Sequence, residues 1–98
     1  MLYVVNAVGT ADKQCPSGYS GWLDLWEKTL HKKAKYCRHC RKETNDLVGG
    51  HVQRTNRYSD GSWHRIPGLY ITPICKECNN PQNNYVFQVA EEDLLPVE

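Results

Sequence analysis

The residues best suited to chemistry in this chain are its five cysteines. Four of them form two C-x-x-C pairs, and Cys15 stands alone as a spare, partly buried thiol. Two residues between cysteines let a tight turn aim both sulfurs at one point, and two such turns supply the four thiolates that tetrahedral Zn²⁺ takes. The alternatives are disulfides or a thioredoxin-like redox pair. Because four thiolates leave no open coordination position, the spacing predicts a structural zinc ion bound by Cys37, Cys40, Cys75 and Cys78.

The charge of the chain is more informative by segment than in total, which is only +1. Residues 28–57 carry nine Lys and Arg against two acids, whereas residues 77–98 carry five acids and no Lys or Arg. This pattern favours a local anionic partner, DNA or RNA, unless the lysines form a solvated helix face that the acidic tail partly covers. No apolar run approaches the roughly 20 residues of a membrane span, so no membrane partner is expected. Without a recognisable export signal, the expected compartment is the cytoplasm.

Aromatic and basic side chains interleave where the sequence predicts a hairpin tip. Such side chains suit base stacking and phosphate contact, and ordinary cross-strand pairing is the alternative. The candidate nucleic-acid contacts are Arg54, Arg57, Trp63, Arg65, Lys32 and Lys35.

The length of 98 residues suits a single α+β domain, and a hydrophobic content of 40% implies a small core that needs an additional staple. The predicted elements are a strand over 2–8, a helix over 21–33 with Ser20 as N-cap, a hairpin turning at Asp60-Gly61, a strand break at Pro67-Gly68, strands over 69–74 and 85–89, and a loosely ordered acidic tail over 90–98. A two-residue turn in that hairpin places Arg57 opposite His64 and His51 opposite Tyr70.

The order of these motifs resembles the treble-clef zinc proteins of the His-Asn-His (HNH) nuclease type. The resemblance covers residues 37–89 and is carried by the two cysteine pairs, by Gly49-Gly50-His51-Val52, and by Tyr70-Ile-Thr-Pro-Ile-Cys75-Lys-Glu-Cys78-Asn79. It is closest to small bacterial and phage proteins with the pattern Gly-Ala-His-Val … Tyr-Ile-Val-Pro-Leu-Cys-x-x-Cys-Asn. It implies a small zinc-stabilised treble-clef domain over 1–98, with an N-terminal strand and helix (1–36), a zinc core (37–89) and an acidic tail (90–98).

The same resemblance implies roles for three residues outside the cysteine pairs. His51 falls on the general base, and Asn79 falls where the group often places a second ligand of a catalytic Mg²⁺ or Mn²⁺. Tyr70 stands where the group has the Asn that orients the base, and Gly50 stands where it has a metal-binding His or Asp. The alternatives for His51 are a structural role or binding of the zinc ion in place of a cysteine.

The sequence therefore predicts three alternative functions. The first is a zinc-binding, HNH-like module that binds nucleic acid and has an incomplete catalytic motif. The second is an active metal-dependent endonuclease that uses His51. The third is a protein-interaction module that presents the Trp22/Trp26 helix face or the acidic tail to a partner.

Overall fold

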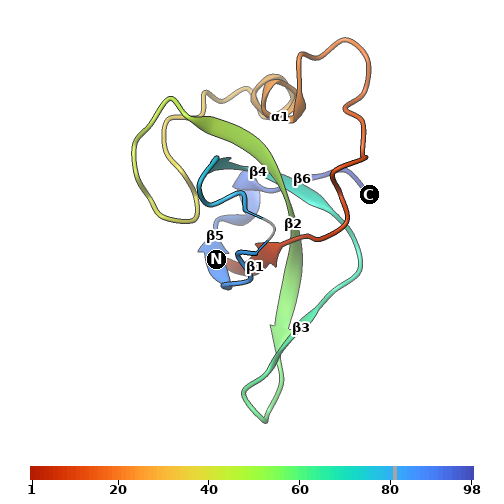
Figure 1. The fold of residues 1–98 in the computed structure, drawn as a ribbon, viewed down its shortest axis with the longest axis vertical. Coiled ribbons are helices and arrows are strands. Elements are labelled where there is room, and N and C mark those ends of the chain that lie inside the picture. Colours follow the sequence, from red (N-terminus) through yellow and green to blue (C-terminus); the bar gives the residue numbers. More distant parts are fainter. Residues whose placement is uncertain (81) are drawn as a thin grey trace.

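One α-helix and a six-stranded antiparallel sheet make up the described part of the chain, which is residues 1–80 and 82–98 of a computed structural model. This confirms the α+β class. The elements are β1 (Leu2–Asn6), α1 (Trp22–Leu30), β2 (Leu47–Arg57), β3 (Trp63–Arg65), β4 (Tyr70–Cys75), β5 (Phe87–Val89), the 3-10 turn η1 (Glu91–Asp93) and β6 (Leu95–Pro96). The sheet order is β5-β1-β2-β4-β6, and β3 pairs with the far end of β2. Figure 1 shows α1 at one end of the molecule and the β2–β3 hairpin tip at the other.

The helix is shorter than the sequence pattern predicts, and its N-cap is Gly21 instead of Ser20. The Ser20 side chain makes no cap hydrogen bond; its backbone N–H donates to Asp24 Oδ2 at 3.1 Å. At the other end, His31 takes a left-handed conformation (φ 54°), and the Lys32 N–H donates to the Glu27 carbonyl at 3.1 Å. This left-handed cap ends α1 at Leu30, before Lys32 and Lys33, which the predicted helix included.

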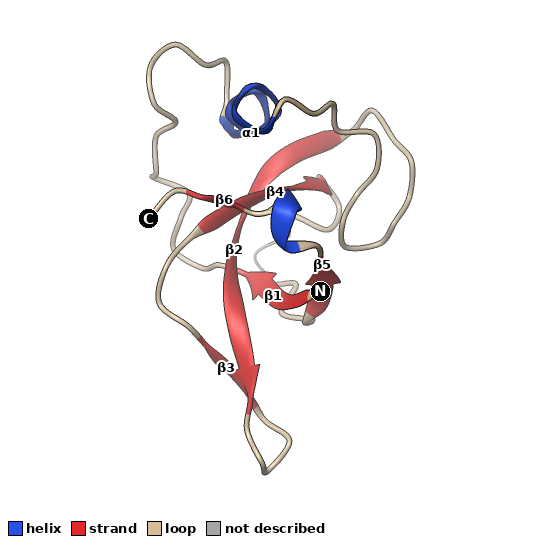
Figure 2. Cartoon of the chain, turned by 180° about the vertical axis from the view of Figure 1, so that it is seen from behind, coloured by secondary structure: helices blue, strands red, loops and turns tan. Residues whose placement is uncertain are grey.

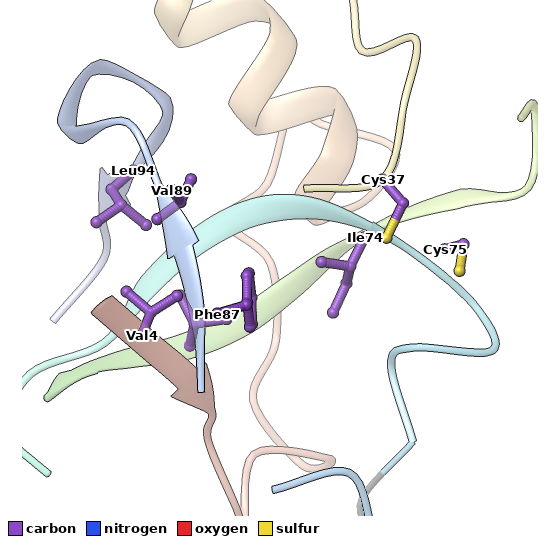
Figure 3. Close-up of a cluster of buried hydrophobic side chains, with 8 residues drawn as sticks. Val4, Cys37, Ile74, Cys75, Phe87, Val89 and Leu94 are labelled. Atoms are coloured by element: carbon purple, nitrogen blue, oxygen red, sulfur yellow. The ribbon is translucent and has the colours of Figure 1, made fainter. Parts of the chain in front are cut away.

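The sheet buries apolar side chains on both faces because neighbouring residues of a strand point to opposite sides. On one face, Ile71 of β4 packs with Trp26 of α1 and Leu95 of β6. On the other face, Ile74 joins the larger cluster that Figure 3 shows between β1, β4 and β5. Trp26 is fully buried and Trp22 is half-buried, so most of the Trp22/Trp26 face is core packing.

The β2–β3 hairpin has a different turn from the one predicted. Arg57 lies opposite Trp63 and not opposite His64, and the Tyr58 N–H donates to the Ser62 carbonyl at 2.8 Å. The loop therefore has three residues, Ser59 to Gly61, with Gly61 at φ 87°. The Asp60 carboxylate accepts the Ser62 N–H at 2.9 Å, which favours the three-residue loop over a two-residue turn.

The predicted break at Pro67-Gly68 is present between β3 and β4, and Gly68 has φ 118°. The break shifts the register of β4 against β2, so His51 lies opposite Ile71 and Tyr70 lies opposite Val52. His51 and Tyr70 therefore point to opposite faces of the sheet, and the predicted pairing of these two residues is wrong.

The acidic tail is ordered, in contrast to the sequence prediction. Residues 91–96 form η1 and β6, and β6 pairs with β4 as the last strand of the sheet (Figure 2). Leu94 is 6% exposed and Leu95 is 8% exposed, each in a different apolar cluster. The four acids of the tail mask this apolar pair in the sequence, but burial of two leucines outweighs the tendency of a charged tail to stay solvated.

Candidate metal centre and associated surfaces

Four cysteine sulfurs, those of Cys37, Cys40, Cys75 and Cys78, lie within 4.8 Å of one another. The Cys40 and Cys75 sulfurs are 3.9 Å apart. Tetrahedral zinc with Zn–S distances of about 2.3 Å requires sulfur separations of about 3.8 Å. The two C-x-x-C pairs therefore meet at a distance at which they can hold one metal ion, and the donor set of four thiolates suits zinc.

The first pair lies in a tight turn that backbone hydrogen bonds hold closed. The Cys37 N–H donates to the Lys42 carbonyl at 2.9 Å, and the Arg41 N–H donates to the Cys37 carbonyl at 2.8 Å. Arg41 has φ 67°, which lets the chain reverse directly after Cys40. Burial raises the pKa of the Cys37 thiol, but hydrogen bonds from the backbone of Cys40, Cys75 and His39 outweigh burial and lower it to about 7. The lowered pKa favours the thiolate form of Cys37, which is the form that binds a metal ion.

The second pair follows β4 in a turn whose Asn79 N–H donates to the Cys75 carbonyl at 2.9 Å. The Asn6 side chain of β1 donates to the Cys78 carbonyl at 2.8 Å and so fixes this turn to the sheet. Burial raises the pKa of both Cys75 and Cys78, so these thiols must lose protons when a metal binds. No α-helix follows the turn in the described residues, although the treble-clef fold that the resemblance implies takes its second pair of ligands from the first turn of a helix. The run Asn79-Asn80-Pro81 explains this locally, because asparagine favours turns and a residue before proline is pushed out of the helical region.

His51 and Asn79 line one pocket of about 630 Å³ between α1 and β2, but Tyr70 does not. His51 is 9% exposed, and its Nε2 is buried without a hydrogen-bond partner among the described residues. The Trp22 ring meets the imidazole edge-on, with ring centroids 4.6 Å apart. Burial lowers the pKa of His51 and the nearby Lys13 lowers it further, although Glu98 opposes them. The imidazole is therefore held neutral, in the form that can accept a proton or ligate a metal.

Gly50 brings no side chain to this region because the space beside it is filled. A Cβ at Gly50 would lie 2.6 Å from Ile74 Cγ1 and 3.3 Å from Asn79 Oδ1. At Gly49 a Cβ would lie 2.6 Å from the backbone of Trp22 and Leu23, so α1 packs directly on the bare backbone of β2. The Gly-Gly sequence is thus explained by close packing on both faces of the strand.

The hairpin carries three of the candidate nucleic-acid contacts on one face. The Arg57 guanidinium lies 5.4 Å from the Trp63 ring centroid. Arg65 is anchored to the body, since its Nη1 donates to the Asn6 carbonyl at 2.8 Å. Arg54 lies on the opposite face of β2 from Arg57, because three positions separate them on the strand.

The two lysine candidates lie elsewhere. Lys32 and Lys35 belong to the segment that directly follows α1, away from the hairpin tip (Figure 1). Lys32 Nζ is 2.7 Å from Asp93 Oδ1, so the C-terminal segment already neutralises its charge, whereas Lys35 is exposed. Four of the nine basic residues of 28–57 form ion pairs, namely Lys28, Lys32, Lys33 and Arg38. The six candidates therefore do not form one surface.

Two residues outside the sequence predictions contribute to these sites. Asn6 supports the second cysteine turn, and Tyr3 packs against Trp63 with ring centroids 5.0 Å apart. Both residues lie on β1, far from their partners in the sequence. No local pattern signals either role.

Comparisons with protein-family models, with curated proteins and with solved structures found no match to this chain. None of the helices in the described part of the chain is long and apolar enough to cross a membrane. The findings thus establish a small α+β protein whose four clustered cysteines are placed to hold a metal ion.

Proposed function

We propose that this protein is a zinc-stabilised, HNH-like module that binds nucleic acid through the tip of its β2–β3 hairpin. The observation that carries the proposal is the combination of cation and aromatic side chains on a projecting hairpin. Arg57 lies over Trp63, and the exposed Tyr58 stacks on His64 with ring centroids 3.7 Å apart. Such side chains offer a guanidinium to phosphate and ring faces to bases.

In the proposed module, the zinc ion holds the base of this hairpin in place. Leu47, at the start of β2, pairs with Cys75, and β2 runs without interruption from there to Arg57 near the tip. Cys37 and Cys75 also belong to the larger apolar cluster (Figure 3). Zinc binding at a structural site contributes on the order of 10–16 kcal/mol in zinc-finger peptides, so the metal fixes the strand that carries the binding surface.

The distribution of ion pairs also favours the hairpin as the contact surface. The acidic C-terminal segment pairs with Lys32 and Arg38 at the α1 end of the molecule. Arg57 forms no ion pair with any described residue. A polyanion therefore meets less competition from the protein's own carboxylates at the hairpin than near α1.

A titration of the zinc-loaded protein into a labelled oligonucleotide tests the proposal. We expect binding that weakens steeply with salt, and we expect Arg57→Gln to weaken it and reduce the salt slope by about one. Lys35→Gln is the matched control, since it removes the same charge from an exposed lysine near α1. Equal loss of affinity in both variants, or binding that is independent of salt, would overturn the hairpin assignment.

The pocket beside α1 favours a second candidate function, a metal-dependent endonuclease that uses His51. His51 and Asn79 line the same pocket, and His51 Nε2 is buried without a partner among described residues. In this case His51 acts as the general base and Asn79 contributes to binding Mg²⁺ or Mn²⁺. We then expect plasmid DNA to be nicked in the presence of either ion and His51→Ala, verified as folded by circular dichroism, to be inactive. Unchanged nicking by that variant would exclude His51 as the base.

A further inference from the structure

A second pocket, of about 580 Å³, lies between the hairpin and the first cysteine turn. Its lining combines aromatic rings from three separate segments. Tyr3 comes from β1, Trp63 comes from β3, and Tyr85 comes from the segment before β5. Tyr3 is 42% exposed and Tyr85 is 74% exposed, so both rings offer surface to a ligand.

Four of the rings in this pocket pack against one another in two pairs. Tyr3 and Trp63 lie with their centroids 5.0 Å apart and their planes inclined by 42°. His39, in the cysteine turn, lies on Phe87 with centroids 4.4 Å apart. A planar ligand therefore meets ring faces whose positions are set before it binds, which reduces the ordering cost of binding.

The polar groups of the pocket have the character that a nucleotide requires. Arg41 is the one lining residue with a full charge, and no acidic residue lines the described pocket. Its Nη2 donates to the Gln88 carbonyl at 2.9 Å, which holds the guanidinium at the pocket while its other N–H groups remain available for phosphate. The side-chain amides of Asn84 and Gln88 supply donors and acceptors for the edge of a base.

A hydrogen-bond network also holds the His39 ring. The Asn83 amide donates to the Cys78 carbonyl at 3.0 Å and lies 3.2 Å from His39 Nε2. Because an amide nitrogen is a donor only, His39 Nε2 is the acceptor in this contact. The second cysteine turn thus orients a ring that lines the pocket.

We propose, as a step that rests on the proposed function, that this pocket takes an unpaired nucleobase and that Arg41 binds a neighbouring phosphate. Trp63 belongs both to this pocket and to the hairpin tip, where Arg57 lies over its ring, so one strand passes from the tip to Arg41. Base faces are available for stacking only in unpaired nucleic acid. The protein therefore prefers single-stranded to duplex nucleic acid.

The test compares three ligands of equal length, about ten nucleotides, with the zinc-loaded protein: a thymidine strand, the same backbone with abasic sites, and a duplex. Loss of one stacked base weakens binding about 5- to 150-fold, so we expect the thymidine strand to bind at least about 5-fold more tightly than either other ligand. Tyr85→Ala should remove most of this difference. Tyr19→Ala, at an exposed tyrosine outside the pocket, should leave it intact.

The outcomes separate this inference from the proposed function. Equal affinity for the thymidine and abasic strands, equal affinity for the duplex, or full retention of the preference in Tyr85→Ala would overturn the base pocket while leaving the hairpin assignment standing. Absence of binding to all three ligands would overturn the proposed function and the base pocket together.

Discussion

A single methyl group added at Gly50 should destabilise the fold measurably. The added Cβ would lie 2.6 Å from Ile74 Cγ1, closer still to its Cδ1, and 3.3 Å from Asn79 Oδ1. Ile74 is fully buried, so its side chain cannot turn away into solvent. Overpacking of this kind costs about 1–3 kcal/mol. In a domain of this size each kcal/mol lowers the melting temperature by about 4–8 °C, so we expect Gly50→Ala to melt about 4–24 °C below the native chain.

A double-mutant cycle tests the cause of that loss. Ile74→Ala by itself leaves a cavity and should cost about 2–5 kcal/mol, but it removes both atoms that the new methyl group meets most closely. Gly50→Ala should therefore cost about 1–3 kcal/mol less in the Ile74→Ala background than in the native chain. Urea denaturation of the zinc-loaded proteins, compared at equal m-value, measures each corner of the cycle.

The matched control is Gly21→Ala, which adds the same methyl group directly before α1. No heavy atom lies within 4 Å of a Cβ there, and we expect a loss of at most about 1 kcal/mol. If Gly50→Ala lowers the free energy of unfolding equally in both backgrounds, contact with Ile74 does not explain why position 50 is a glycine. A metal-binding His or Asp at position 50 would need the space that Ile74 occupies. Gly50→Asp should accordingly lose stability without gaining metal-dependent cleavage of plasmid DNA.

Three further predictions follow from the cysteine cluster, His51 and Asp93. Native mass spectrometry should find one Zn²⁺ per chain in the native protein and in Cys15→Ser, and none in Cys78→Ser. An intact fold after strong chelation would contradict a structural role for the ion. The folded pKa of His51 lies below its ordinary value of 6.5, so the unfolded chain takes up the proton first and stability should fall as the pH drops below about 6.5. As the pH drops below about 6.5, the urea midpoint of His51→Gln should fall less than that of the native chain. An equal fall in both proteins would exclude His51 as the cause of the pH dependence. Asp93→Ala should lower the free energy of unfolding in urea by about 3 kcal/mol, because its partner Arg38 is only 7% exposed. Asp46→Ala, which removes an exposed ion pair, should lower it by less than about 1 kcal/mol. Equal losses would refute the view that burial makes the Asp93 pair the stronger one.

Local patterns predicted the features that depend on neighbouring residues. The C-x-x-C spacing identified two turns whose sulfurs do meet, because two intervening residues suffice to aim both sulfurs inward. The Trp22/Trp26 period identified the buried side of α1, and Pro67-Gly68 identified the break between β3 and β4. These signals act over a few residues, where backbone geometry and side-chain spacing are nearly independent of the rest of the fold.

Long-range packing decided the features that the sequence did not. The three-residue turn and the break after β3 together moved Tyr70 to the face away from His51, because a shift of one residue reverses the side of a strand. Burial of Leu94 and Leu95 drew an acidic tail onto the sheet, where Asp93 neutralises Lys32.

The sequence by itself predicted the four cysteines that cluster, the α+β class and the presence of a hairpin with basic and aromatic side chains. Only the tertiary structure determined which basic residues remain unpaired, that Trp22 packs against His51, and that Tyr3, Trp63 and Tyr85 line one pocket. The physical reason is that ion pairing and pocket formation depend on segments brought together by sheet order. The pairing of β5 with β1 and of β1 with β2 is set by burial over the whole chain, so no local sequence pattern predicts it.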